Sequence, residues 1–273
     1  MAPIPPSFIL PIASSGHLTC TQPSQRIYLF SFELPPDNRI TPSFCATLLL
    51  ALDIIDHRYP KGVVVTTSSI SKFYSNGLDY ESAMKTPNFF SHSLYPLWRR
   101  LLTYPMPTLA LLPGHAFAGG FMTAIMHDYR FMNPHRGYLC LNELEFGAPL
   151  APPMASIFRQ KVPNPNTFRT MVLEAKRYNA LEGLKEGFLD GLGGVPEVIT
   201  FVQEMKLVDK AKSGVYGRLK TEMWGETVRL LDEYESGQDR ANQEGKAQEQ
   251  RQNEEKKRVE EWERGMNRGK SKL

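Results

Sequence analysis

The sequence predicts an α/β fold in which strands and helices alternate, followed by a C-terminal helical region. Apolar, strand-like runs begin near Val63, Leu109 and Leu139, with helical segments between them. From about residue 167 onward, apolar residues recur at helical spacing. The repeat favours stacked ββα units, although the residues alone leave an open doubly wound sheet as an alternative.

The N-terminal region contains one expected strand and one expected helix. Residues 1–25 are rich in Pro and Ser, so we expect this stretch to be poorly ordered at its start. The segment Arg26–Leu34 predicts a strand, and Pro35–Asn38 predicts a turn. Thr41 is a suitable N-cap and Pro42 a suitable first helical residue, so a helix should begin there.

The first segment of chemical interest follows the β-branched run at Val63. Ser75, Asn76 and Gly77 predict a turn, because glycine adopts positive φ at no steric cost. The N–H of Leu78 could then point outward without a partner. The alternative is an ordinary strand-to-helix turn capped by Asp79, which is the commoner meaning of such a sequence by itself.

The second segment is a glycine-rich strand-to-helix turn. An apolar strand ends at Pro113-Gly114, and a helical pattern continues from Phe121. Gly119 and Gly120 therefore lie at a helix N-terminus, where backbone N–H groups lack intrahelical partners and the helix dipole favours negative charge. Tight packing between strand and helix would also require glycine, so both interpretations remain open.

The third segment carries the acidic residues. A strand at Tyr138–Leu141 leads into Asn142 and Glu143, and strand alternation would place Leu141, Glu143 and Glu145 on one face. A carboxylate at the end of an apolar strand is partly desolvated, which raises its pKa. The alternative is a pair of solvent-facing acids in a loop. With two free N–H groups for a carbonyl oxygen and one carboxylate for a proton, the three segments suit chemistry on a thioester.

Taken together and in this order, the segments resemble the crotonase (enoyl-CoA hydratase/isomerase) superfamily from about residue 26 to about residue 210. The closest likeness is to the plant type of peroxisomal Δ3,Δ2-enoyl-CoA isomerase. The motifs that carry the superfamily resemblance are Pro107-Thr108-Leu109-Ala110, His127-Asp128-Tyr129-Arg130 and Ala180–Leu184 with Gly187–Asp190. Those that carry the likeness to the isomerases are Pro96-Leu97-Trp98-Arg99 and Pro105–Thr108. The resemblance implies a crotonase-like superhelix of ββα units.

The resemblance also implies the site residues. The oxyanion hole falls on the N–H groups of Leu78 and Gly119, and the catalytic acid–base residue falls on Glu143. Substrate-binding positions fall on Ser75, Asn76, Gly77 and Gly120. Two-carboxylate hydratases have a second glutamate where this chain has Met122, which favours isomerase over hydratase. Ala118 replaces the first glycine of the usual run of three.

The reaction implied is isomerisation of a 3-enoyl-CoA to a trans-2-enoyl-CoA in the β-oxidation of unsaturated fatty acids. No metal or redox cofactor is expected, and CoA is part of the substrate. Two alternatives remain. The first is an enoyl-CoA hydratase in which Glu145 or another residue acts as second acid, and the second is a non-catalytic acyl-CoA-binding homologue.

Composition excludes several other classes. The net charge of +3 over 273 residues is too small to indicate a nucleic-acid partner. Cys20, Cys45 and Cys140 are far apart, which fits a reducing compartment and predicts no metal site. The sequence contains no run of 18 apolar residues, so no membrane span is expected. The tripeptide Ser271, Lys272 and Leu273 matches a peroxisomal address that an import receptor reads.

Three regions are therefore expected along the chain. Residues 1–200 form the crotonase-fold core with the acyl-CoA site, and residues 201–238 form a C-terminal helical oligomerisation region. By the resemblance, that region would build a homotrimer or hexamer. Residues 239–273 form a charged tail without a sustained heptad, either a solvated helix or a disordered tether.

Overall fold

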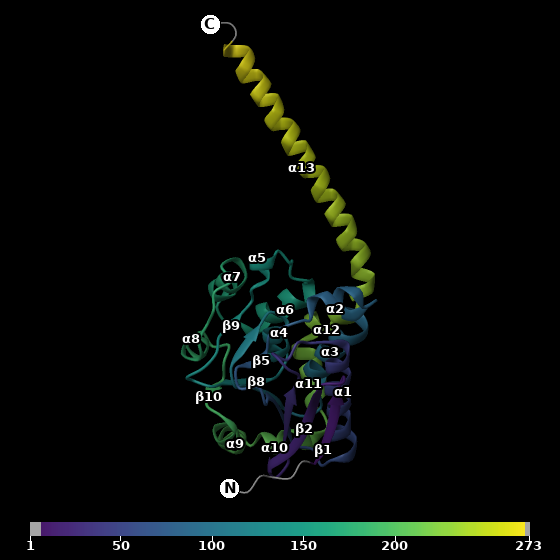
Figure 1. Cartoon of the computed structure of the whole chain (residues 1–273), viewed down its shortest axis with the longest axis vertical. Helices are drawn as coiled ribbons and strands as arrows, with labels where there is room; N and C mark the ends of the chain where they lie inside the picture. Colours follow the sequence, from purple (N-terminus) through teal and green to yellow (C-terminus); the bar gives the residue numbers. More distant parts are fainter. Residues whose placement is uncertain (1–6, 271–273) are drawn as a thin grey trace. The chain divides into compact units, whose positions relative to one another are not determined.

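The computed structural model describes residues 7–270, with side chains at all of these positions except 238–245 and 261–270. The chain divides into two compact units, Met1–Asp232 and Glu233–Leu273 (Figure 1). Residues 201–232 thus belong to the same compact unit as the strands. The expected division into core, oligomerisation region and tail stays a prediction.

A mixed sheet forms the larger layer of the first unit. Within the described residues it has seven strands, in the spatial order β1-β2-β3-β4-β6-β8-β10. The first three strands pair antiparallel, and those from β3 onward pair parallel. Their bounds are β1 (Phe8–Ile12), β2 (Gly16–Ser24), β3 (Ile27–Glu33), β4 (Val63–Ser68), β6 (Thr108–Leu112), β8 (Tyr129–Met132) and β10 (Gly191–Leu192).

The poor order expected at the start of the chain stays a prediction, because residues 1–6 lie outside the described residues. The sequence predicts no strand at residues 8–24. They form the β1–β2 hairpin, in which Phe8 pairs with Cys20 and Ile12 with Gly16. Leu18 and Cys20 alternate into the core, while the Pro and Ser residues of the same stretch dilute the apolar signal. Pairing with β3 orders this hairpin, and a local sequence pattern does not reveal that contact.

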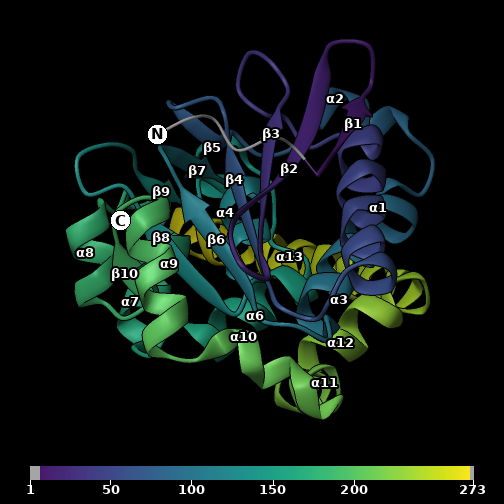
Figure 2. The same cartoon turned by 90° about the horizontal axis from the view of Figure 1, so that it is seen from below.

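A second, smaller sheet has three parallel strands in the order β5-β7-β9, with bounds β5 (Phe73–Ser75), β7 (His115–Phe117) and β9 (Leu139–Cys140). Each of the pairs β4–β5, β6–β7 and β8–β9 contributes its first strand to the large sheet and its second to the small one. A helix follows each pair. The chain is therefore built from stacked ββα units and not as a doubly wound sheet (Figure 2).

Helices cover both sheets. Helix α1 begins after Thr41, whose hydroxyl accepts the Phe44 N–H, with Pro42 as its first residue as expected. One core cluster packs α9 and α10 against β3, β4, β6 and β8, with Val198 and Leu207 among its buried residues. The helix bounds are α1 (Pro42–Arg58), α2 (Tyr80–Lys85), a π-helical turn (Phe90–Leu94), α3 (Tyr95–Thr103), α4 (Gly119–Ile125), α5 (Glu143–Phe146), α6 (Pro152–Lys161), α7 (Pro165–Leu173), α8 (Ala180–Lys185), α9 (Val195–Glu204), α10 (Leu207–Lys210), a 3₁₀ turn (Ala211–Ser213), α11 (Tyr216–Met223) and α12 (Gly225–Asp232).

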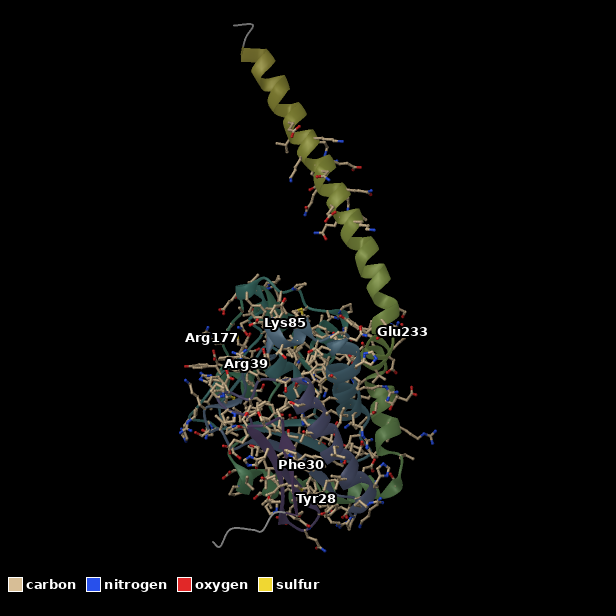
Figure 3. All side chains as sticks on the ribbon, turned by 45° about the vertical axis from the view of Figure 1, so that its right-hand side comes forward. Tyr28, Phe30, Arg39, Lys85, Arg177 and Glu233 are labelled. Atoms are coloured by element: carbon tan, nitrogen blue, oxygen red, sulfur yellow. The ribbon has the colours of Figure 1, made fainter. Side chains whose placement is uncertain are left out.

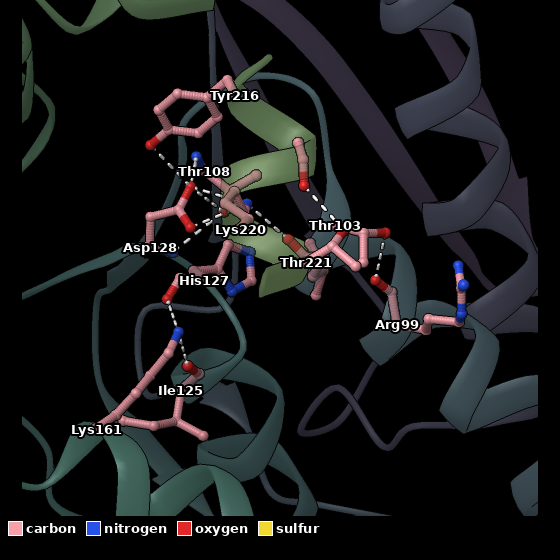
Figure 4. Close-up of polar contacts among 12 residues, drawn as sticks. Arg99, Thr103, Thr108, Ile125, His127, Asp128, Lys161, Tyr216, Lys220 and Thr221 are labelled. Carbon is pink, nitrogen blue, oxygen red and sulfur yellow. Dashed lines mark hydrogen bonds and ion pairs between the residues drawn. The ribbon is translucent and has the colours of Figure 1, made fainter. Parts of the chain in front are cut away.

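Buried lysines attach the later helices to α3, to α4 and to the segment before β8 (Figure 4). The Lys220 ammonium of α11 donates to the Leu101 carbonyl at 2.8 Å and to the Asp128 carboxylate at 2.9 Å. From α6, the Lys161 ammonium donates to the carbonyls of Ile125 and His127 and thereby satisfies the C-terminal end of α4. Burial lowers the pKa of both lysines. Helix α4, which carries the glycine turn, is thus held at its far end by a later helix.

The second unit consists of the helix α13 (Tyr234–Lys270). Its described side chains from 246 to 260 are exposed, which matches the solvated-helix alternative for the tail. In the described part of the chain, no helix combines the length and the apolar character that a membrane crossing requires. Ser271, Lys272 and Leu273 lie outside the described residues.

Candidate active site

The three predicted segments meet at one edge of the small sheet. Strand β5 ends at Ser75, β7 at Phe117 and β9 at Cys140, and β7 pairs parallel with both neighbours. In a parallel sheet, the residues that follow the strands emerge at the same edge, which is where ligands bind in many α/β proteins. The Ala118 N–H donates to the Cys140 carbonyl at 2.9 Å, so the second and third segments are in direct contact.

The turn after β5 has the predicted conformation. Gly77 has φ of +85°, and its N–H donates to the Ser75 hydroxyl at 3.2 Å. Asp79 caps helix α2 by accepting the Ser82 N–H, as the commoner interpretation of this turn expects. In the described part of the chain, the Leu78 N–H donates to no acceptor. The turn therefore supplies both a helix cap and a free donor.

The glycine turn after β7 places a second free donor beside the first. Gly119 is the first residue of α4, and no acceptor among the described residues takes its N–H. A Cβ built on Gly119 would lie 3.5 Å from the Leu78 nitrogen, and one built on Gly77 would lie 3.4 Å from the Gly119 nitrogen. The two donors thus lie close together, as an oxyanion hole requires.

Three of the predicted substrate-binding residues help to build the turns. A Cβ on Gly120 would lie 2.4 Å from the Ser75 carbonyl oxygen, so this glycine is needed for close packing. The Ser75 hydroxyl is buried and donates to the Asn38 carbonyl, and the Asn76 side-chain amide donates to the Asp37 carboxylate at 2.6 Å. A substrate contact at Ser75, Asn76, Gly77 or Gly120 stays a prediction.

Glu143 follows the end of β9 by three residues, and because β9 pairs parallel with β7 it emerges at the same sheet edge as these donors. It is 9% exposed, and its Oε2 atom is buried with no hydrogen-bond partner in the described structure. Burial raises the pKa of its carboxyl to about 7. A carboxyl with a free oxygen and a pKa near neutrality can both accept and return a proton.

The prediction that Glu143 and Glu145 share a strand face is wrong. Glu143 opens the short helix α5, because the backbone leaves the extended conformation at Asn142, with φ −99° and ψ 22°. Residues two apart on a helix point in different directions. Glu145 is consequently exposed and pairs with Arg177 at 3.7 Å, whereas Glu143 is buried. Of the two carboxyls, only Glu143 is buried.

Sequence reasoning missed the loop that holds the first turn. The side-chain amide of Asn38 donates to the carbonyls of Phe73 and Tyr74, and its side-chain oxygen accepts the Leu34 N–H. The Arg39 guanidinium donates to the carbonyls of Asn76 and Leu78. The segment Pro35–Asn38 predicts only a turn. The positive φ of Asn38 (54°) is a conformation that Asn tolerates in turns. No local pattern indicates which distant turn this loop contacts.

Met122 is buried within α4, so this position of the glycine helix carries no carboxylate. The described residues contain no group of three His, Cys, Asp or Glu side chains arranged to hold a metal ion. What the site presents is therefore a carboxyl and two backbone donors.

Comparisons with known proteins identify the family. The family model described as enoyl-CoA hydratase/isomerase matches residues 23–272. The chain belongs to the enoyl-CoA hydratase/isomerase family. Its curated relatives include enoyl-CoA delta isomerase 3 of Arabidopsis thaliana, which is 29% identical over 218 residues covering 76% of this chain and 92% of that protein. The peroxisomal enoyl-CoA delta isomerase 1 of Arabidopsis thaliana is also 29% identical, over 78% of this chain and 92% of its own length.

Solved structures share the fold. The human mitochondrial delta3-delta2-enoyl-CoA isomerase superposes with a TM-score of 0.69 at 20% identity, covering 80% of this chain and 88% of that protein. A Mycobacterium tuberculosis enoyl-CoA isomerase in its apo form also gives 0.69, at 21% identity, covering 81% of this chain and 96% of that protein. The likeness establishes the predicted crotonase-type arrangement of ββα units for this member of the family.

Proposed function

We propose that this protein isomerises a 3-enoyl-CoA to a trans-2-enoyl-CoA. One observation carries the proposal. The buried Glu143 carboxyl, with a free Oε2 and a pKa of about 7, lies at the same sheet edge as the two unpaired N–H groups of Leu78 and Gly119. The isomerase names of the Arabidopsis relatives support the same reaction.

In the proposed mechanism, the Glu143 carboxylate removes a proton from C2 of the acyl group. The C2–H electron pair forms the C1–C2 double bond of a dienolate, whose C3–C4 double bond is still in place, and the carbonyl π electrons move onto the thioester oxygen, where negative charge develops. The N–H groups of Leu78 and Gly119 stabilise that charge. The dienolate then takes the same proton from Glu143 at C4, so the C3–C4 double bond becomes a C2–C3 double bond and no atom is gained or lost.

Apolar side chains beside the site suit an acyl chain. Tyr80 of α2 and Phe146 of α5 form an edge-to-face contact with ring centroids 6.4 Å apart, although each is more than half exposed. Tyr80 follows the Leu78 donor by two residues, and Phe146 follows Glu143 by three. An apolar surface next to a proton-transfer group favours a fatty acyl thioester over a polar substrate.

Hydration of a double bond by this family would require a second acid to hold and activate water. Glu145 is exposed and paired with Arg177, and the position of the second glutamate is the buried Met122. These two observations favour isomerase over hydratase. A non-catalytic binding role is disfavoured, because a buried carboxyl without a partner destabilises the fold and has no use in binding a neutral acyl chain.

The first prediction tests the base. Glu143→Gln preserves shape and removes the carboxylate, so turnover of 3-hexenoyl-CoA should fall by about 10² to 10⁴ with little change in KM. Glu145→Gln is the matched control and should retain wild-type turnover. Conjugated product from 3-hexenoyl-CoA, with no hydration of 2-hexenoyl-CoA, selects isomerase. Normal turnover by Glu143→Gln would move the base elsewhere.

The pH dependence sharpens the same test. For wild type, kcat/KM should rise about tenfold per pH unit below a pKa of about 7 and then level off, because the free enzyme must carry ionised Glu143. The folded state binds the Glu143 proton more tightly than the unfolded chain does. The contribution of this proton to the free energy of unfolding is therefore complete below about pH 4.5 and is lost as the pH rises to about 7. Glu143→Gln should therefore unfold at a higher temperature than wild type at pH 8 and not at pH 4.

We also propose peroxisomal import and assembly into a homotrimer or hexamer. Two Arabidopsis relatives are named as peroxisomal and a human relative as mitochondrial, so the relatives alone leave the compartment open. If an import receptor reads Ser271-Lys272-Leu273, a fluorescent fusion that keeps this tripeptide at its free end should enter peroxisomes. Deleting the tripeptide should leave a cytosolic, active enzyme. Unchanged localisation after the deletion would contradict this proposal.

A further inference from the structure

We propose that Arg39 is a positioning residue for the oxyanion hole. Its guanidinium holds the carbonyl oxygens on both sides of the Leu78 N–H, so that this donor faces the thioester oxygen. The inference rests on the proposed function of that hole and assigns a role to a residue outside it. In Figure 3, Arg39 lies well away from Tyr28 and Phe30 of the preceding strand β3.

The contacts of Arg39 are specific. Its Nη1 donates to the Asn76 carbonyl at 3.1 Å and to the Leu78 carbonyl at 3.2 Å, and its Nε donates to the Asp37 carboxylate at 3.1 Å. The same Asp37 oxygen accepts the Asn76 side-chain amide at 2.6 Å. One cation thus connects two carbonyls of the turn, while Asp37 fixes the direction of the guanidinium.

The loop that contains Arg39 satisfies nearly every polar backbone group of the turn. The Ile40 N–H donates to the Gly77 carbonyl at 2.8 Å, and the Asp79 N–H donates to the Ile40 carbonyl at 3.2 Å. The Asn76 N–H donates to the Asp37 carbonyl at 3.0 Å. With Arg39 on the remaining carbonyls, the Leu78 N–H is the group of this turn that no described residue uses. A peptide held at both neighbouring carbonyls cannot rotate its N–H away from the substrate.

Arginine suits this task better than lysine would. A planar guanidinium presents several N–H groups in a fixed fork, so it can bind two carbonyls and a carboxylate in a single orientation. Its positive charge is hydrogen-bonded to the carbonyl of Leu78, the residue whose N–H would stabilise the developing oxyanion. Because the side chain is 44% exposed, this charge is partly screened and the positioning contacts carry most of the effect.

The kinetic arm compares Arg39→Ala, Arg39→Lys and Arg99→Ala in the full-length protein. Arg99 is the matched control, because it is 47% exposed and also pairs with an aspartate, Asp232. Arg39→Ala should lower kcat about 10- to 100-fold with little change in KM, which is less than the ~10²–10³ expected for losing a whole donor. Arg39→Lys should recover part of the loss, and Arg99→Ala should equal wild type.

The spectroscopic arm uses acetoacetyl-CoA, whose enolate resembles the dienolate and absorbs in the ultraviolet. The apparent pKa of the bound ligand reports how well the hole stabilises an oxyanion and does not depend on turnover. We expect Arg39→Ala to raise this pKa by about one to two pH units, which corresponds to the same 10- to 100-fold loss. Glu143→Gln and Arg99→Ala should not raise it.

The outcomes separate the two proposals. If wild type produces no conjugated product but still stabilises the enolate in an Arg39-dependent way, the proposed reaction fails and the role of Arg39 stands. If wild type isomerises and Arg39→Ala leaves the enolate pKa unchanged, the inference about Arg39 is overturned, even where kcat falls through reduced stability. If wild type stabilises no enolate, the oxyanion hole and the role of Arg39 are overturned, and if it also forms no conjugated product, the proposed reaction is overturned with them.

Discussion

The two turns that supply the oxyanion donors are built in different ways. The turn after β5 is held by polar contacts from a separate loop, in which Asn38 and Arg39 bind its carbonyls. The turn after β7 is held by its own backbone and by close packing, with the Ala118 N–H on the Cys140 carbonyl and Gly120 against Ser75. Each turn therefore presents an unpaired backbone N–H, but the first turn is held mainly by hydrogen bonds from another loop and the second mainly by close packing.

This difference determines how each donor can be damaged. The Leu78 donor depends on side chains that are nearly forty residues earlier in the chain, so substitutions there should impair it without touching the substrate. Around the Gly119 donor, close packing dominates and one side-chain hydrogen bond, from the Thr123 hydroxyl to the Gly119 carbonyl, is present. This donor should therefore be damaged mainly by added atoms or by loss of the N–H itself. Arg39→Ala belongs to the first kind and the substitutions below to the second.

Among substitutions at the two donor turns, the largest effect is expected for Gly119→Pro. Proline removes the N–H, and losing one oxyanion donor typically lowers kcat by ~10²–10³. Gly119 is the first residue of α4, a position at which helices accept proline because its N–H has no intrahelical partner. Activity on 3-hexenoyl-CoA and the circular dichroism spectrum should be measured together.

Gly119→Ala is the matched control for that variant. It keeps the N–H and adds a Cβ that would lie 3.1 Å from the Leu78 side chain, which is flexible enough to move. Gly119→Ala should therefore retain most of the activity that Gly119→Pro loses. A folded and fully active Gly119→Pro enzyme would show that this N–H is not a donor to the substrate.

The smallest effect is expected at Ala118, which precedes the donor. Ala118 has φ of 47° and ψ of −124°, a backbone conformation that residues with a Cβ rarely adopt and that costs of order 1–3 kcal/mol. Ala118→Gly removes this strain but adds freedom to the unfolded chain, so the expected net gain in stability is about 1 kcal/mol. Urea denaturation measures it. A loss of stability would show that the Ala118 side chain contributes more packing than its conformation costs.

Much of the site could be predicted from the sequence because its signals are local. A glycine-rich run between a strand and a helix predicts the start of α4, and the structure places Gly119 as its first residue. Thr41-Pro42 predicts the start of α1 for the same reason, since capping depends on neighbouring residues. In each case the determining interaction spans only a few positions.

The failures share the opposite property. Glu143 was placed on a strand, yet β9 stops at Cys140 and a helical turn begins, which separates the environment of Glu143 from that of Glu145. Strands β1 and β2 were missed because they depend on pairing with β3. The contacts of Arg39 with the turn after β5 connect residues 37 and 39 positions apart.

The sequence by itself determined the alternation of strands and helices and the glycine-rich turn before α4. It also determined that the acidic segment with Glu143 follows the two turns along the chain. These follow from side-chain periodicity and backbone freedom, which act over a few residues. Only the tertiary structure decided that Glu143 is buried and its pKa raised, that Glu145 is exposed and pairs with Arg177, and that Arg39 contacts the Leu78 turn. Desolvation and hydrogen bonding to distant carbonyls exist only once the parallel strands bring those segments to one edge.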